Sequence, residues 1–397
     1  MMLFLFRIFA SLVTLGWCYA FFRSLRAMIK KKWTLTTEQT PASPDTKISI
    51  IIPARNEERC IENVVRSCFS QDHNHKNLEI IVLDDGSTDQ TGSILKEMQC
   101  QNDLLTVIER NPETDDLPKG WFGKPWALQR AQKHAKGEWL VFVDADVTLF
   151  PAAISRSIGY AQQNDLDMLT GLGELEVQSF WERVMQPAVG AIILAGNSLS
   201  EVNDPSKKDK NLANGQFIAI SRKAYDAIGQ HRCVQQNILD DIGIARAVTA
   251  NNFKYHCLHL THMFSCRMYT SFGEIWEGWT KNLFAGLRYS WKNLIGAVCF
   301  TLLFSVSGPI LLVLAFLLSW NVEFLYWGIS MTVPLQATRL VVDIRRKQPL
   351  IYGITHAPAS FIVCLIMINS AIKSSKGTVQ WKDRTYQPNT EDANEEV

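Results

Sequence analysis

Hydrophobic residues form long runs near both ends of this chain and short runs across its middle. Residues 1–22 are apolar apart from Arg7. Three further apolar runs follow at Leu294–Trp320, Val322–Val342 and Leu350–Ile372. Each of the four runs reaches the roughly 20 residues that a transmembrane helix needs. A buried helical subdomain is the alternative, but the near absence of charge in the three later runs disfavours it. The pattern predicts membrane helices at both ends of the chain.

Positive charge follows the first apolar run instead of preceding it. A cleaved secretory signal carries its positive charges before its apolar core. An uncleaved anchor with positive charge on its C-terminal side places that side in the cytoplasm. We therefore predict an anchor and basic flank over 1–33, a linker over 34–46 and a cytoplasmic catalytic domain in a multi-pass cell-membrane protein. The basic residues of the flank are Arg23, Arg26, Lys30, Lys31 and Lys32.

The C-terminal runs leave two topologies open. Arg345, Arg346 and Lys347 lie between the second and third runs and predict a cytoplasmic loop there. Three complete crossings would then leave the basic segment Lys373–Tyr386 outside the cell. We therefore expect re-entry either of the first run, which Gly308-Pro309 interrupts, or of the third, which contains Pro358. This predicts a transmembrane or re-entrant region over 294–372 and a polar tail over 373–397.

Short strand and helix patterns alternate in the middle of the chain. Strands alternating with helices predict an α/β domain with a mainly parallel sheet, which we assign to residues 47–265. Two aromatic-rich stretches, Phe180–Leu199 and Phe272–Tyr289, are either core helices or interfacial ones, the second within an interfacial region over 266–293. The predicted strands are Ile48–Ile52, Glu79–Leu83, Leu104–Ile108 and Trp139–Val143, and the predicted helices lie around Glu57–Ser70, Gln90–Cys100 and Pro125–Ala135.

Polar clusters follow three of the predicted strands. They are the stretches 53–57 (P-A-R-N-E), 84–89 (D-D-G-S-T-D) and 144–146 (D-A-D). Ligands of such sheets bind beyond the carboxyl ends of the strands. Asp144 and Asp146 share one side of an extended segment because side chains repeat with period two. Their oxygens suit Mg²⁺ or Mn²⁺, whose other ligands can be phosphate oxygens. The pair predicts a site for a metal-bound diphosphate.

Together these motifs resemble those of the family 2 glycosyltransferases with the GT-A fold, a Rossmann-like α/β fold, over about residues 47 to 281. The resemblance implies a metal-binding D-x-D element at Asp144 and Asp146, with Asp144 also near the nucleotide-sugar. It implies that Lys124, at a helix start in Gly123-Lys124, lies near the diphosphate, and helix N-termini do favour phosphate. The nucleoside-binding residues implied by the family are Pro53, Ala54, Arg55, Glu57, Asp84 and Asp85.

The resemblance also implies catalytic and acceptor-binding residues. The family's base is the second acid of a Glu-Asp pair, which here reads Asp240-Asp241, so Asp241 is the expected base and Asp240 departs from the family pattern. One base suffices for an inverting displacement. A carboxylate pair that only stabilises a helix N-terminus is the alternative. The segment 214–217 (N-G-Q-F) resembles the acceptor floor and implicates Gly215 and Gln216, and Arg267 is a further acceptor candidate.

Other stretches narrow the resemblance to membrane-bound family members that glycosylate carotenoid acids or accompany hopanoid synthesis. They are 143–147 (V-D-A-D-V), 266–269 (C-R-M-Y), 277–281 (E-G-W-T-K) and 379–386 (V-Q-W-K-D-R-T-Y). We therefore expect an inverting hexosyltransferase that moves a sugar, as a UDP-sugar, onto a membrane lipid.

Two other functions are alternatives to this one. A processive polysaccharide synthase would need more membrane spans and a Q-x-x-R-W element, of which residues 336–340 (Q-A-T-R-L) keep only part. A catalytically silent membrane scaffold would have no need to retain Asp144, Asp146 and Asp241. Net charge and cysteine spacing add two exclusions. A net charge of +1 gives no support for a nucleic-acid partner. Nine single cysteines without a C-x-x-C pair predict free thiols.

Overall fold

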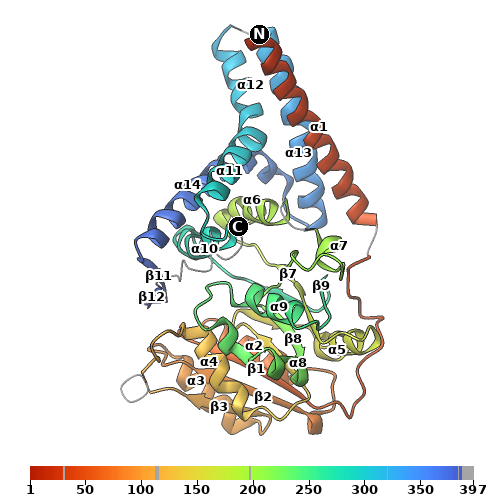
Figure 1. The fold of residues 1–397 in the computed structure, drawn as a ribbon, viewed down its shortest axis with the longest axis vertical. Coiled ribbons are helices and arrows are strands. Elements are labelled where there is room, and N and C mark those ends of the chain that lie inside the picture. The colour runs from red at the N-terminus through yellow and green to blue at the C-terminus, as the bar shows by residue number, and fades with distance from the viewer. Residues whose placement is uncertain (30–31, 112–115, 196–197, 320, 383, 387–397) are drawn as a thin grey trace.

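The computed structural model describes residues 1–29, 32–111, 116–195, 198–319, 321–382 and 384–386. Lys30 and Lys31 of the basic flank, Trp320 of the first C-terminal run and residues 387–397 of the tail lie outside the described residues. Figure 1 shows three levels: an α/β domain at one end, a narrow group of helices at the other, and a layer of helices between them.

The α/β domain is built on a seven-stranded sheet with the order β3-β2-β1-β4-β8-β6-β9. The first four strands in this order are parallel, while β8 runs antiparallel to β4 and β6. All four predicted strands are present, and the predicted mainly parallel sheet is confirmed. The strands are β1 (Ile48–Ala54), β2 (Leu78–Asp84), β3 (Leu105–Glu109), β4 (Trp139–Val143), β6 (Met168–Leu172), β8 (Phe217–Ser221) and β9 (Tyr255–His259).

Helices cover both faces of this sheet, which explains its continuous apolar strands. In β1, Ile50 and Ile52 join the core under one set of helices, while Ile51 joins the core under the other. Successive side chains point to opposite faces, so the isoleucines of β1 are buried on both faces of the sheet. One face carries α2 (Ile61–Phe69), α3 (Thr91–Gln101) and α5 (Ala153–Gln163), and the other carries α4 (Gly123–Ala131), α8 (Arg222–Ala227) and α9 (Asp240–Ala250).

A small second sheet joins two loops that matter for the site. Its order is β5-β10-β7, formed by β5 (Val147–Leu149), β10 (Phe264–Cys266) and β7 (Glu174–Leu175). Cys266 pairs with Val147, so the acidic turn before β5 lies beside the segment that follows β10. The predicted linker also packs onto the domain, because the Leu35 amide donates to the His259 carbonyl (3.0 Å) and the Ala42 amide to Ser155 (2.8 Å).

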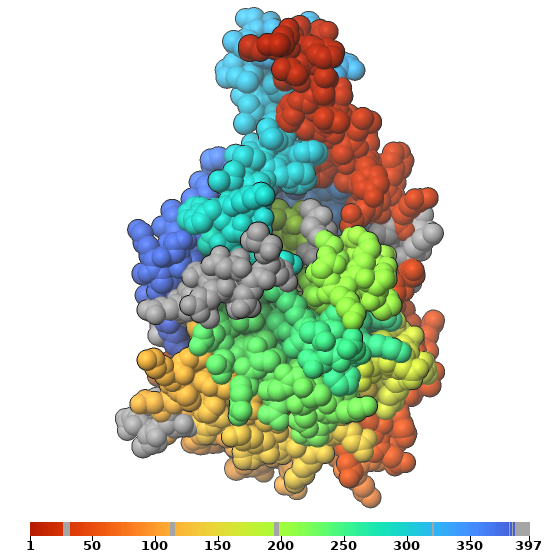
Figure 2. Space-filling view, in the orientation of Figure 1, coloured from red at the N-terminus to blue at the C-terminus, as the bar shows by residue number. Residues whose placement is uncertain are grey.

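The narrow group of helices consists of α1 (Met2–Ile29), α12 (Ser307–Leu317) and α13 (Val322–Arg345). α13 packs against both others, and Arg7 of α1 pairs with Glu323 of α13 at 2.7 Å. Figure 2 shows the upper part of this group projecting away from the α/β domain. Many of its large apolar side chains are exposed, which in a soluble protein would be unusual and in a bilayer is expected.

Three helices of the described residues are long and apolar enough to cross a membrane: Met2–Arg26, Trp291–Leu317 and Leu350–Ser375. The second combines α11 (Trp291–Thr301), a π-helical turn over Leu302–Val306 and α12. That turn precedes Pro309, which lacks the amide that a regular helix would use. The predicted run Val322–Val342 forms α13 but is not one of the three. It carries Glu323, which pairs with Arg7 in an exposed position, and Arg339, which pairs with Asp343 in the interior.

The last apolar helix, α14 (His356–Ser375), runs obliquely between the narrow group and the α/β domain (Figure 1). It packs against α6 (Phe180–Ala195), α10 (Phe272–Gly286) and α11. The protein itself buries 50% of its most apolar stretch, against 11% for α1. A hairpin of β11 (Val379–Trp381) and β12 (Arg384–Tyr386) follows and returns to the α/β domain.

Candidate active site

A cavity of about 670 Å³ lies at the carboxyl ends of β1, β2 and β4, facing the helical layer. Thirteen of the fourteen site residues expected from the sequence line it, and Asp84 is the exception. The Asp84 carboxylate instead accepts hydrogen bonds from the Ser87 amide (2.9 Å) and hydroxyl (2.5 Å), so it holds the turn of its own D-D-G-S-T-D segment. The topology thus assembles residues that are spread over more than half of the chain.

At one end of the cavity, Asp85 lies between two guanidinium groups. Its Oδ1 accepts a hydrogen bond from Arg110 Nη1 (3.0 Å) and its Oδ2 one from Arg384 Nη1 (2.5 Å). Arg55 Nη1 donates to the carbonyls of Asp85 (2.8 Å) and Gly86 (3.2 Å), which ties the end of β1 to the end of β2. Asp85 is buried and fully engaged, so it fixes the shape of this end of the cavity.

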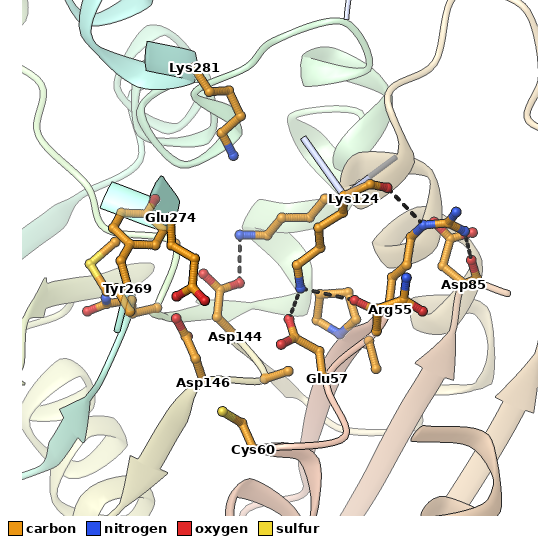
Figure 3. A pocket seen from close by; sticks show the side chains of 18 of the residues that line it. Arg55, Glu57, Cys60, Asp85, Lys124, Asp144, Asp146, Tyr269, Glu274 and Lys281 are labelled. Carbon is orange, nitrogen blue, oxygen red and sulfur yellow. Dashed lines mark hydrogen bonds and ion pairs between the residues drawn. The ribbon is translucent and has the colours of Figure 1, made fainter. Parts of the chain in front are cut away.

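The two aspartates of the D-x-D turn have different surroundings. Asp144 Oδ1 accepts from Lys124 Nζ at 2.6 Å, as Figure 3 shows. Asp146 Oδ1 is buried and has no hydrogen-bond partner in the described part of the chain. Burial first, and the charges of Asp144 and Glu57 next, raise the pKa of Asp146 to about 7. A buried carboxyl with one oxygen unpartnered among the described residues, beside a second carboxyl, suits a hard cation, so this pair fits Mg²⁺ or Mn²⁺.

The cavity residues do not form a complete metal site alone. Among the described residues, no group of three or more His, Cys, Asp or Glu side chains could hold an ion. A cation on Asp144 and Asp146 would therefore take further ligands from phosphate or water, as Mg²⁺ commonly does.

Lys124 and Asp241 converge on the backbone of Gly215. A Cβ atom at Gly215 would lie 2.9 Å from Lys124 Nζ, 3.6 Å from Asp241 Oδ2 and 3.7 Å from Asp144 Oδ2. Lys124 is in the first turn of α4. Burial disfavours its charge, but Asp144 and then Asp240 outweigh burial and raise the pKa of Lys124. Glycine keeps this point open, so that a ligand can reach all three groups.

Asp241 begins α9 together with Asp240, and its oxygens face backbone amides. Oδ2 accepts from the Gly215 amide (2.9 Å) and Oδ1 from the Ile242 amide (2.8 Å). Burial, followed by the Asp240 charge, raises the pKa of Asp241 to about 6 against the opposing effects of Lys124 and these amides. A carboxylate with a pKa just below neutral pH is suited to accept a proton.

Gln216 and Arg267, the other expected acceptor residues, also line the cavity. Gln216 Nε2 contacts Cys266 Sγ at 3.1 Å. Arg267 pairs with Glu182 of α6 through Nε (2.9 Å) and Nη2 (3.2 Å). Glu182 is buried, and its pairing with Arg267 connects the cavity wall to the helical layer.

Four cations that line the cavity were missed by the sequence interpretation: Arg59, Lys281, Lys382 and Arg384. Lys281 extends from α10 over the cavity (Figure 3), and burial, followed by the Lys124 charge, lowers its pKa to about 8. Lys382 and Arg384 come from the C-terminal hairpin. Residues 379–386 resemble a stretch of the membrane-bound family members, but nothing in their sequence indicates which part of the fold they contact. Lys281 belongs to the noted segment 277–281, which likewise carried no assigned role.

Comparison with known proteins identifies the α/β domain as a glycosyltransferase. Residues 49–229 match the family model described as Glycosyl transferase family 2, so the chain carries a family 2 glycosyltransferase domain. It is 26% identical over 346 residues to the 4,4'-diaponeurosporenoate glycosyltransferase of Staphylococcus aureus strain MRSA252, covering 85% of this chain and 88% of the relative. The USA300 protein of the same name is 27% identical over 66% of this chain and 67% of its own.

Solved structures give weaker similarities. The mannosyltransferase PcManGT from Pyrobaculum calidifontis, in complex with GDP-Man and Mn²⁺, is 18% identical with a TM-score of 0.47, over 92% of this chain and 97% of that one. Residues 1–349 of S. aureus TarS, in complex with UDP-GlcNAc, are 17% identical with a TM-score of 0.41, over 81% and 91% of the two chains.

Proposed function

We propose that this glycosyltransferase transfers a sugar, with inversion, from a UDP-sugar to a membrane lipid, and that the lipid is a carotenoid acid or a similar long apolar acceptor. The observation that carries the proposal is the convergence of Lys124, Asp144 and Asp241 on Gly215 inside one cavity that is also lined by residues of α10. The names of the S. aureus relatives support the acceptor class.

The donor would occupy the cavity from Asp85 to the D-x-D turn. Pro53, Ala54, Arg55 and Glu57 line the nucleoside end together with Asp85. Lys124, charged and at a helix start, would neutralise the diphosphate. Asp144 and Asp146 would hold the Mg²⁺ or Mn²⁺ ion, which when bound neutralises charge on the departing diphosphate as a Lewis acid.

Asp241 would act as the base. In the proposed step, an acceptor oxygen forms a bond to the anomeric carbon of the sugar. A hydroxyl acceptor gives its proton to Asp241, whereas a carboxylic acid acceptor is already ionised at neutral pH and attacks as the carboxylate. The bond from the anomeric carbon to the diphosphate oxygen breaks, and its electron pair leaves with the nucleoside diphosphate. The Gly215 and Ile242 amides orient the Asp241 carboxylate for this role. Asp240 supports it through charge, because its proximity raises the pKa of Asp241.

The acceptor would enter from the helical layer. Phe180 and Trp181 on α6 are 54% and 37% exposed, and the Trp181 ring lies 4.6 Å from Phe272 of α10. Aromatic residues of this kind favour the membrane interface. Gly215, Gln216 and Arg267 line the cavity between this layer and the D-x-D turn. A lipid lying along α6 and α10 would therefore present its polar end to Asp241.

The same geometry supports a membrane arrangement. α1 and the α11–α12 helix would cross the bilayer, α13 would return beside them, and α14 would lie at the cytoplasmic surface. The α/β domain and the C-terminal hairpin then share the cytoplasmic side. The alternative of a processive synthase loses support, because Arg339 of the partial Q-x-x-R element pairs with Asp343 on α13 and does not line the cavity.

The test uses full-length protein in detergent with Mn²⁺, a panel of UDP-sugars and a lipid extract containing carotenoid acids. Mass spectrometry should detect a lipid heavier by one sugar residue, and this product should be absent with the Asp144→Asn variant. Transfer from GDP-sugars alone would contradict the donor assignment, and chains of added sugars would favour the processive alternative.

A further inference from the structure

The C-terminal hairpin places two positive charges inside the cavity. Lys382 Nζ contacts Glu57 Oε1 and donates to the Arg55 carbonyl at 3.0 Å. Arg384 Nη1 donates to Asp85 Oδ2 at 2.5 Å. These side-chain partners are separated by 325 and 299 residues in the chain. The hairpin itself packs against α10 and α14, so the membrane region determines where the two cations lie.

The position of Arg384 is electrostatically unfavourable for a cation unless an anion lies beside it. A Cβ atom at Gly123 would lie 1.8 Å from Arg384 Nη1 and 3.3 Å from Asp85 Oδ2. Gly123 begins α4, whose first turn has no side-chain cap from Phe122. The N-terminus of a helix carries partial positive charge, so a guanidinium group there is unfavourable unless an anion lies between them. Asp85 provides one such anion, and a diphosphate would provide a stronger one.

Carboxylates outnumber Lys and Arg among the side chains that line the cavity. Ten carboxylate side chains and seven Lys or Arg side chains line it, and two of the seven come from the hairpin. A nucleoside diphosphate entering this cavity adds further negative charge. Lys124 already pairs with Asp144, and Arg267 with Glu182. Lys382 pairs with Glu57, and both line the same cavity as the D-x-D turn.

Building on the proposed function, we propose that Lys382 and Arg384 bind the diphosphate of the nucleotide-sugar, so that the C-terminal hairpin completes the donor site. In the free protein the two cations pair with Glu57 and Asp85. When the donor binds, they keep these positions and add hydrogen bonds to phosphate oxygens. Asp85, whose oxygens contact Arg110 and Arg384, then acts by positioning Arg384.

The test compares nucleotide with nucleoside. Full-length wild type, Lys382→Gln, Arg384→Gln and the double variant are prepared in detergent with Mn²⁺. Binding of UDP or GDP, whichever the wild type binds, is measured by calorimetry, and binding of the parent nucleoside by competition. Losing hydrogen bonds to a charged group should weaken nucleoside diphosphate binding by about 10- to 100-fold in the double variant. Nucleoside binding should be unchanged.

Two control variants separate this role from folding. Lys376→Gln removes a cation from the exposed start of the tail and should bind the nucleotide as the wild type does. Lys382→Arg keeps the charge and should retain most of the nucleotide affinity. Unchanged nucleotide affinity in the double variant would overturn the inference. So would an equal loss for nucleotide and nucleoside, which would mean that the cations only hold Asp85 and Glu57, or a gain for both, which would make the hairpin a plug. A wild type that binds neither UDP nor GDP would instead refute the proposed function itself.

Discussion

Asp241 Oδ2 accepts a 2.9 Å hydrogen bond from the backbone amide of Gly215, 26 residues earlier in the chain. This contact joins the start of α9 to the loop before β8. It fixes the carboxylate beside Lys124 without using a side chain as the donor. A carboxylate held by amides keeps its orientation while its other lone pairs remain available to accept a proton.

The Asp241→Asn variant should lose sugar transfer but still bind the nucleotide-sugar donor. A general base contributes about 10²–10⁴ to the rate, and the amide is close in shape to the carboxylate. Product mass after reaction with a lipid acceptor measures transfer, and calorimetry with Mn²⁺ measures donor affinity. Near wild-type transfer would place the base elsewhere, with Asp240 as the first alternative. Loss of donor binding would instead assign Asp241 to the donor site.

Transfer should decline on the acidic side of neutrality. The pKa of Asp241 is raised to about 6, so the group is an unprotonated base above that pH and is protonated below it. For a lipid acceptor with a hydroxyl group, we expect kcat/KM to fall as the pH drops through about 6 and to be level above it. Saturating Mn²⁺ is needed during the measurement, because a bound cation keeps the neighbouring Asp146 ionised. A profile that stays level down to pH 4.5 would contradict the role of Asp241.

Activity should require a divalent cation. Within the part of the chain that the structure describes, Asp146 Oδ1 is buried without a hydrogen-bond partner, and removing the charge of Asp146 removes a hard ligand. Excess chelator should abolish transfer, and Mn²⁺ should restore it. Asp144→Asn and Asp146→Asn should both lose the rise in melting temperature that Mn²⁺ with nucleotide gives the wild type. The matched control is Asp89→Asn, which changes a carboxylate at the edge of the same cavity. Full turnover in chelator would refute the metal assignment.

The α/β domain should face the cytoplasm. Cys100 and Cys233 are exposed thiols of this domain and are natural probes. A membrane-impermeant maleimide should label them in lysed cells and leave them unlabelled in intact cells. A Met2→Cys variant places a thiol at the far end of α1, where the same reagent should label it in intact cells. Labelling of Cys100 in intact cells would reverse the orientation, whereas an unlabelled Met2→Cys would mean that α1 does not cross.

The strands and most site residues could be predicted because their signals are local. An uninterrupted apolar run such as Ile48–Ile52 has only one stable environment, a sheet covered on both faces, so it specifies a central strand wherever it occurs. Polar residues directly after such strands must then gather at one edge of the sheet. β6 and β8 were missed because Met168–Leu172 and Phe217–Ser221 are short runs that occur equally in helices.

The membrane region illustrates a different limit. Apolar length predicted helices, yet it did not distinguish α14, which the protein half buries, from α1, which is largely exposed. Both sequences are apolar because lipid and a protein interior exclude water alike. Packing against α6, α10 and α11 decides between them.

By itself, the sequence determined four strands of the sheet and the acidic residues at their ends, including Asp144 and Asp146, since these depend on neighbours in the chain, while Lys124 and Asp241 came from the family resemblance. Only the tertiary structure decided that Asp84 holds its own turn, and that Lys382 and Arg384 reach Glu57 and Asp85. The reason is physical. A charged side chain in a tail has the same local sequence whether it contacts water or a distant carboxylate, and only the path of α14 brings this hairpin back to the cavity.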